Sequence, residues 1–464
     1  MFRFLILLVA CLSTAPAFSA EDVHRPNPDQ DPASCAACHT RIYEEWKSSG
    51  MGRDLDNPKV YQFYTATNSK GEKDGLGYQG MFPGKAGDCA DCHVPVQVID
   101  AHKAGKEVDL GHAMANKTDH GISCYFCHSM KEAKIEKDAD GKYKTRIFDS
   151  VTLDQESGAR YGPRKGVKAP HPVVETQLHK SSNVCATCHL NQEKHLSIST
   201  FDDWNRYFTA GKVKQTCQEC HMPLHKGKKE LAIGGAKRDG VRAHTFVGAQ
   251  DPEMLKKALR LDARAGMTTD GKLLVTATVE NVGAGHKVPG SGPIRNVILK
   301  IDAWDQDGKP LVFAGPDSGK LHPLAGMGNP KTGARDDNDW GGLPGKMYAK
   351  IFASKPNPQT GKPMLGVGGF AADTVALDNG LEPFAPDMTE YQFELPEGVK
   401  TVKVRAKLVY RYAFKPIIDR KGWSLDERPS FMAEKTLNVP VAKLKPMKSA
   451  VNASLQKTGP DKVN

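Results

Sequence analysis

The chain has 464 residues, of which 64 are Lys or Arg and 54 are Asp or Glu, giving a formal net charge of +10. The 44 Gly and 30 Pro indicate many loops, but 39% hydrophobic residues exclude a disordered or collagen-like chain. The mean hydropathy of −0.49 excludes a polytopic membrane protein. The length predicts about two or three domains.

The N-terminus has the pattern of an export signal. Arg3 is followed by an apolar stretch at residues 4–12, which is too short to span a bilayer, and by small residues at 15–19 that suit cleavage. We expect residues 1–20 to be a signal peptide and the mature chain to have no transmembrane segment. In an alternative interpretation, the signal ends before Cys11, which would then carry a lipid.

Ten of the eleven cysteines form five copies of Cys-x-x-Cys-His. The copies are Cys35, Cys38 and His39; Cys89, Cys92 and His93; Cys124, Cys127 and His128; Cys185, Cys188 and His189; and Cys217, Cys220 and His221. This pattern is typical of covalent c-type haem attachment. The two thiols add to the two vinyl groups of one porphyrin, and the adjacent imidazole faces the iron as its proximal ligand.

Two other kinds of protein site, zinc sites and disulfides, also use paired cysteines. Zinc ribbons contain such pairs but do not require a histidine directly after each one. Disulfides within Cys-x-x-Cys are typical of redox thiols, and five of them would be unusual in one exported chain. The five histidines therefore favour five covalently bound c-type haems, with iron as the metal.

The motifs lie within residues 35–221, so each haem has few residues to form an apolar shell. We therefore expect the porphyrins to pack close together and to form much of the core, which permits electron transfer between them. The haem propionates would offset the basic net charge. Since the chain also has no Arg-rich arm or recognition motif, we expect no nucleic-acid partner.

Helical and extended patterns divide the chain into two parts. In the haem region we expect a Pro/Asp-rich extended leader and short helices; beyond it we expect one more helix and then strands that alternate with period two. The leader is at residues 21–34, the helices at 42–46, 175–196 and 253–261, and the strands at 272–280, 296–303, 402–412 and, more weakly, 435–443. A turn is expected at Asp307-Gly308.

The predicted fold class is α+β multidomain: a haem-packed, mostly irregular and helical N-terminal module, followed by an all-β, sandwich-like domain. The predicted domains are a pentahaem cytochrome module at 21–250, a β-domain at 262–445 and a disordered tail at 446–464. Within the β-domain, residues 314–390 read as a long Gly/Pro-rich insertion, either functional or a cover over the haems.

The ligand on the far side of each iron decides what a haem does, because two protein ligands make an electron carrier and an open position permits catalysis. Among the remaining histidines, His244 follows the fifth motif closely. His286 lies in a Gly-rich bend where the backbone can approach a flat cofactor. The alternative for His286 is an ordinary turn residue.

Three features together resemble the multihaem c-type cytochromes of bacterial respiration that have a C-terminal β-domain. They are Trp46-Lys-Ser-Ser after the first motif; Gly121-Ile-Ser before the third motif with Met222-Pro223 after the fifth; and the His244 and His286 segments, which continue into Arg295 and the strand around Leu299. The resemblance covers most of residues 30–412. It implies that His244 and His286 are distal haem ligands, so that the β-domain would ligate a haem.

One position departs from that family. Its common pattern is W-x-x-S-x-H, whereas the fifth residue after Trp46 is Met51 here. A thioether can bind iron and raises the potential relative to two imidazoles. We therefore predict Met51 as a ligand, with a packing methionine as the alternative.

His112 and His179 are the next candidates for the remaining iron positions. The other histidines rank lower, in the order His120 and His171, then His102, His195 and His225, and last His24 and His322. The chain has enough His and Met to fill every sixth position, and no motif carries Lys in place of the proximal His, as some multihaem reductases do.

We therefore expect a pentahaem c-type cytochrome that transfers electrons in an exported respiratory chain, with no catalytic residue. Its partners would be redox proteins or other cytochromes. Its location would be the periplasm, the outer-membrane surface or the extracellular space. Two alternatives stay open: a multihaem oxidoreductase acting on a small nitrogen or sulfur oxyanion, and a subunit of an extracellular cytochrome polymer or other homo-oligomer.

Overall fold

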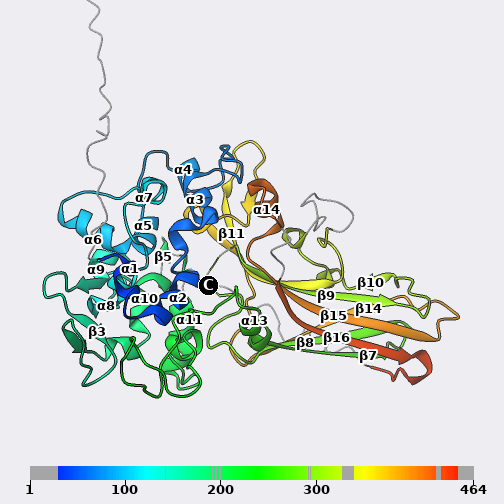
Figure 1. Cartoon of the computed structure of the whole chain (residues 1–464). Coiled ribbons are helices and arrows are strands. Elements are labelled where there is room, and N and C mark those ends of the chain that lie inside the picture. The colour runs from blue at the N-terminus through cyan, green and yellow to red at the C-terminus, as the bar shows by residue number, and fades with distance from the viewer. Residues whose placement is uncertain are drawn as a thin grey trace, which may run out of the picture.

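The computed structural model describes residues 30–447, except 142, 191, 194, 195, 198, 199, 291, 293, 327–338 and 425–429. The predicted signal peptide, Cys11, His24, His195 and nearly all of the predicted tail lie outside the described residues. Figure 1 shows a module of short helices and loops beside an elongated β-sandwich. The predicted α+β multidomain class is confirmed. Within the described part of the chain, no helix has the length and apolar character needed to cross a bilayer.

The N-terminal module consists of short helices, and four of the five haem-attachment motifs lie within one. Three motifs coincide with α5 (Cys89–His93), α8 (Cys124–His128) and α12 (Cys217–His221), and the fourth ends α10 (Asn183–His189). The first motif begins in α1 (Pro32–Ala36) and ends just before α2 (Thr40–Ser48).

Other short elements connect these motif helices. The helices are η2 (Asp54–Asp56), α3 (Pro58–Thr65), α4 (Tyr78–Met81), α6 (Pro95–Lys103), α7 (Leu110–Asn116), α9 (Ile147–Ser150), η3 (Leu178–Lys180) and α11 (Thr200–Thr209). The strands form three small pairs: β1 (Met130–Ala133) with β2 (Val151–Leu153), β3 (Arg160–Gly162) with β4 (Val173–Glu175), and β5 (Gln192–Glu193) with β6 (Leu196–Ser197).

Side chains placed just before the motifs start their helices. Asp31 accepts a hydrogen bond from the amide of Ala33 at the start of α1, and Ser123 accepts one from Phe126 at the start of α8. Thr216 and Glu219 form a capping box on α12. These caps start the helical turns of three of the five motifs.

The sequence predicts the helices of this module only in part. The helix expected at 42–46 is confirmed as α2, but the helix expected at 175–196 is wrong. A new helix starts at Asn183, whose amide donates to the hydroxyl of Ser181 at 3.2 Å, and α10 ends at His189. Serine offers the backbone this local alternative to a continuous helix.

The C-terminal domain has two antiparallel sheets packed face to face. After α13 (Pro252–Ala258), the smaller sheet has the order β10-β14-β8-β7, with β7 at Leu259–Met267, β8 at Leu273–Asn281, β10 at Phe313–Gly315 and β14 at Pro386–Phe393. The larger has the order β12-β11-β9-β15-β16, with β13 paired to β11. Its strands are β9 (Asn296–Trp304), β11 (Gly345–Pro356), β12 (Pro363–Leu365), β13 (Thr374–Asp378), β15 (Thr401–Arg411) and β16 (Ser430–Pro440). Short helices η4 (Asp317–Gly319), η5 (Pro323–Ala325), η6 (Gly369–Ala371), α14 (Lys415–Lys421) and η7 (Val441–Lys443) join them.

The predicted alternation is confirmed where one face of a strand meets the core. The strands expected at 272–280, 296–303 and 402–412 are β8, β9 and β15, and the weak strand is part of β16. The expected insertion at 314–390 is wrong, because this segment supplies β11 and β14, which pair with β9 and β8. The helix expected at 253–261 ends at Ala258, because Leu259 already pairs with Asn281.

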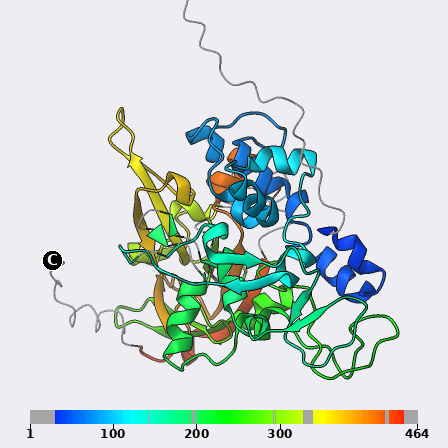
Figure 2. The same cartoon turned by 90° about the vertical axis from the view of Figure 1, so that its left-hand side faces the viewer.

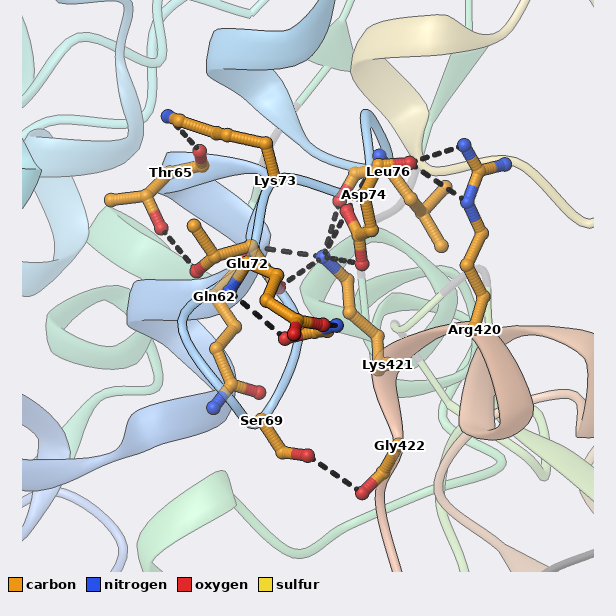
Figure 3. Close-up of polar contacts among 12 residues, drawn as sticks. Gln62, Thr65, Ser69, Glu72, Lys73, Asp74, Leu76, Arg420, Lys421 and Gly422 are labelled. Atoms are coloured by element: carbon orange, nitrogen blue, oxygen red, sulfur yellow. Dashed lines mark hydrogen bonds and ion pairs between the residues drawn. The ribbon is translucent and has the colours of Figure 1, made fainter.

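A buried lysine joins the two domains (Figure 3). The side chain of Lys421, at the end of α14, is 0% exposed. Its ammonium contacts three carbonyl oxygens and one carboxylate of the N-terminal module: Gln62 at 3.0 Å, Thr67 at 2.8 Å, Leu76 at 2.5 Å and Asp74 at 3.0 Å. These contacts fix the β-domain against α3 and the segment that follows it.

Candidate haem-binding site

Among the described contacts, four motif histidines share one hydrogen-bonding arrangement. In each, Nδ1 lies close to an oxygen acceptor: Leu231 O at 2.9 Å from His39, Asp54 Oδ2 at 2.6 Å from His93, Tyr161 O at 2.7 Å from His128 and Val247 O at 2.6 Å from His221. Donation from Nδ1 fixes the tautomer whose Nε2 lone pair can bind a metal. These rings are therefore oriented as ligands.

His93 differs because its acceptor is a carboxylate. Burial lowers the pKa of the His93 imidazole, but the hydrogen bond and the charge of Asp54 outweigh burial, so the pKa is raised overall. A carboxylate on the far nitrogen also makes an imidazole a more basic metal ligand. Asp54 lies on η2 and is itself buried.

Cysteine side chains from different motifs lie close together. In three pairs the thiols lie close enough for each to shift the pKa of the other: Cys35 with Cys124, Cys92 with Cys188 and Cys185 with Cys217. Other contacts also bring these motifs together. Cys92 Sγ lies 3.8 Å from the carbonyl oxygen of Cys188. The amide of Cys217 donates to Oγ of Ser182, the residue that precedes α10, at 3.1 Å. The attachment points of different motifs are therefore close neighbours.

His286 lies opposite the proximal histidine of the fifth motif. Its ring centroid is 6.4 Å from that of His221, and the rings are 14° from parallel. Nδ1 of His286 is 2.8 Å from Lys287 O, so both rings keep Nε2 for a ligand. With metal–imidazole bonds of about 2 Å, this separation leaves room for one metal between two ring nitrogens.

Glycines allow the bend that carries His286. A Cβ on Gly283 would lie 2.1 Å from the carbonyl oxygen of Lys257, and one on Gly285 would lie 2.9 Å from Val213. The bend therefore runs too close to its neighbours for any larger residue.

His179 and His244 both lie near His128 of the third motif. Their ring centroids are 5.3 Å and 6.3 Å from that of His128. Nδ1 of each is buried without a hydrogen-bond partner in the described part of the chain. One imidazole suffices opposite His128, so the other would serve the iron of a neighbouring motif.

Burial keeps most of these imidazoles neutral. It lowers the pKa of His179, His189 and His244 to about 4, and it lowers the pKa of His128 and His286 below the ordinary value. A neutral imidazole is the form that binds a metal.

Met51 lines a hollow of about 290 Å³ together with His120. Nε2 of His120 is buried without a partner among the described residues, and its Nδ1 lies 4.0 Å from Asp31 Oδ1. His112, which the sequence ranks above His120, is exposed on α7, with Nδ1 3.2 Å from the side-chain amide of Asn116. The geometry thus favours His120; its only sequence signal is its place four residues before Cys124.

Other histidines have different roles. The ring of His102 stacks on Phe148 with centroids 3.7 Å apart, and Nδ1 of His322 accepts from the amide of Leu324. Nε2 of His225 is 2.9 Å from the carboxylate of Glu45. Nδ1 of His171 is 3.1 Å from the carbonyl oxygen of Pro172.

We expect His120 to be the ligand in this hollow rather than Met51. A buried ring nitrogen without a partner costs about 1–3 kcal/mol, which metal binding would recover, whereas a thioether sulfur has no comparable need. His120→Ala should convert one haem to high-spin, and the control Met51→Leu should leave every haem low-spin in the electron paramagnetic resonance spectrum. The reverse pattern would restore Met51 as the ligand predicted from the sequence.

The donor set fits covalently attached haem. Paired thiols on helical turns, oriented proximal imidazoles and buried imidazoles with one unpartnered ring nitrogen are the groups that such a cofactor requires. No group of three or more His, Cys, Asp or Glu side chains among the described residues is arranged to hold a metal ion by itself. When bound, haem iron supplies one-electron chemistry by alternating between its ferrous and ferric states.

Comparison with known proteins adds a structural relative. No protein-family model matches the chain, and no curated protein matches it. A solved structure, the penta-heme cytochrome c552 from Thermochromatium tepidum, is similar with a TM-score of 0.61 and 21% sequence identity, over 90% of this chain and 100% of that one. The chain has a multihaem-cytochrome-like fold. Both the N-terminal module and the β-sandwich fall within this likeness, because it spans nearly the whole chain.

Proposed function

We propose that the protein is a pentahaem c-type cytochrome that carries electrons in an exported respiratory chain. The observation that carries the proposal is the shared setting of the motif histidines: in the described contacts of His39, His93, His128 and His221, Nδ1 lies beside an oxygen acceptor, which leaves Nε2 for iron. The solved relative is itself a penta-heme cytochrome.

The thiol pairs support transfer between haems. Each thiol would hold the edge of its own porphyrin, so contact between thiols of two motifs brings two porphyrin edges together. The pairs Cys35–Cys124, Cys92–Cys188 and Cys185–Cys217 link the first motif with the third, the second with the fourth and the fourth with the fifth. The fourth motif has neighbours on two sides and would be a junction for electrons.

The imidazoles support a carrier rather than an enzyme. His286 lies opposite His221, and His179 and His244 both lie near His128. Filled sixth positions leave no iron open to a substrate. Export to the periplasm or beyond follows from the N-terminal signal pattern, and the proposed partners are other redox proteins.

A redox titration followed by visible spectroscopy, with carbon monoxide added to the reduced protein, tests this function. A carrier should take up five electrons per chain reversibly and should bind no carbon monoxide, because an electron-carrying haem of this kind has two protein ligands on its iron. Stoichiometric binding of carbon monoxide by the native protein would contradict the carrier and favour an oxidoreductase with an open iron.

A further inference from the structure

The segment after the fifth motif forms a hairpin that folds back onto the first motif. In this basic hairpin (residues 224–242), Leu224 pairs with Arg242, and Lys229 and Arg238 exchange backbone hydrogen bonds of 2.9 and 2.8 Å. The amide of Ile233 at its tip donates to the carbonyl oxygen of Cys38 at 2.8 Å. Figure 2 shows green loops of this part of the chain beneath the dark-blue α1 and α2. The hairpin is thus bound to the place where the first haem would be attached.

Further contacts hold the hairpin rigidly. Leu231 O accepts from Nδ1 of the proximal His39 at 2.9 Å, and the guanidinium of Arg41 donates to Glu230 O at 2.7 Å. At the base, Nε2 of His225 lies 2.9 Å from the carboxylate of Glu45. The exposed side chains of the hairpin therefore project from a fixed frame.

Those exposed side chains are mainly basic. The acids Glu230 and Asp239 are outnumbered by six cations, four exposed lysines and two half-exposed arginines. The cations are Lys226, Lys228, Lys229, Lys237, Arg238 and Arg242. The ion pair of Lys228 with Asp239 is 3.7 Å long and largely exposed, so it neutralises little of this charge. The surface also carries two apolar side chains, Leu224 at 56% exposed and Ile233 at 68% exposed.

The hairpin also lies where haem would come closest to solvent. Of the ten motif cysteines, Cys38 and Cys220 are the two exposed ones. Cys38 meets the hairpin tip, and Cys220 comes four residues before the hairpin begins. A thioether at either position would hold a porphyrin edge beside this basic surface.

We propose that the basic hairpin docks an acidic redox protein, which exchanges electrons with the haem of the first motif. This inference rests on the proposed function and names the chemistry of its partner. A basic rim around a small apolar patch attracts an acidic surface over long range, and the apolar patch excludes water once contact is made. The exposed Cys38 and Cys220 place the porphyrin edges within such a contact.

The test compares two variants of the haem-loaded protein that lose the same charge. The first carries Lys226→Gln, Lys228→Gln, Lys229→Gln and Lys237→Gln; the control carries Lys355→Gln, Lys362→Gln, Lys403→Gln and Lys435→Gln on the β-domain, where all four lysines are also exposed. Stopped-flow spectroscopy measures reduction by flavodoxin hydroquinone, an acidic protein donor, and by reduced lumiflavin, a small neutral donor. Both are measured across a range of ionic strength.

At low ionic strength, the hairpin variant should react with flavodoxin about tenfold more slowly than the native protein and the control, with a weaker salt dependence. Its rate with lumiflavin should not change. Equal losses in both variants would show an effect of net charge and overturn the proposal. An unchanged salt dependence together with shifted haem potentials would also overturn the proposal, because the lysines would then interact with haem propionates and not with the partner. Failure of lumiflavin to reduce even the native protein would instead overturn the proposed function.

Discussion

His286→Ala should leave all haems covalently attached but convert one of them from low-spin to high-spin. His286 comes from the β-domain and lies 6.4 Å from His221, whereas attachment depends on Cys217 and Cys220 of the N-terminal module. Removing the imidazole would open one iron without breaking a thioether bond. The open haem should have a shifted potential and should bind carbon monoxide in the reduced state.

Low-temperature electron paramagnetic resonance measures the spin state directly. His322→Ala is the matched control, because His322 is also a β-domain histidine but accepts a backbone hydrogen bond from Leu324. The control should keep the native spectrum. An unchanged low-spin spectrum in His286→Ala would make His286 a turn residue and give the β-domain a role separate from the haems.

Lys421→Met should lower the free energy of unfolding by about 3–5 kcal/mol, which is the usual cost of removing one partner of a buried charge pair. The substitution would leave Asp74 and three carbonyl oxygens, including that of Gln62, without their shared donor. Because these acceptors belong to the N-terminal module, the contact between the two domains should weaken as well.

Urea denaturation followed by circular dichroism measures the loss. Lys256→Met is the control, because the Lys256–Glu253 pair is exposed and should contribute less than about 1 kcal/mol. Similar, small shifts of the unfolding midpoint in both variants would show that Lys421 does not hold the domains together.

The sequence predicts those parts of the fold whose signal is local. Strands β8, β9 and β15 were predicted because one face of each lies in the core and the other is more polar. Strand β11 was missed because it lies in a segment rich in Gly and Pro, which reads as loop when only the local pattern is considered. Strand β7 was missed because its boundary with α13 is set by pairing with β8, a contact that no local pattern encodes.

The residues of the candidate site also differ in how well the sequence predicts them. The cysteines and proximal histidines follow from a five-residue pattern, whereas a distal ligand depends on contacts between distant segments. His120 ranked low because nothing near it in sequence shows that it will line a hollow together with Met51 and Leu55. The family pattern directed attention to His286, but only the fold places it opposite His221 rather than another motif histidine.

Intact-mass spectrometry of the denatured protein tests the central claim most directly. The protein should be produced in a host that matures c-type cytochromes and treated with iodoacetamide after denaturation. The account predicts the mass of the mature polypeptide plus five haems, with none of the ten motif cysteines alkylated, because thioether bonds survive denaturation. Four or fewer haems, or alkylated motif cysteines, would contradict a pentahaem cytochrome.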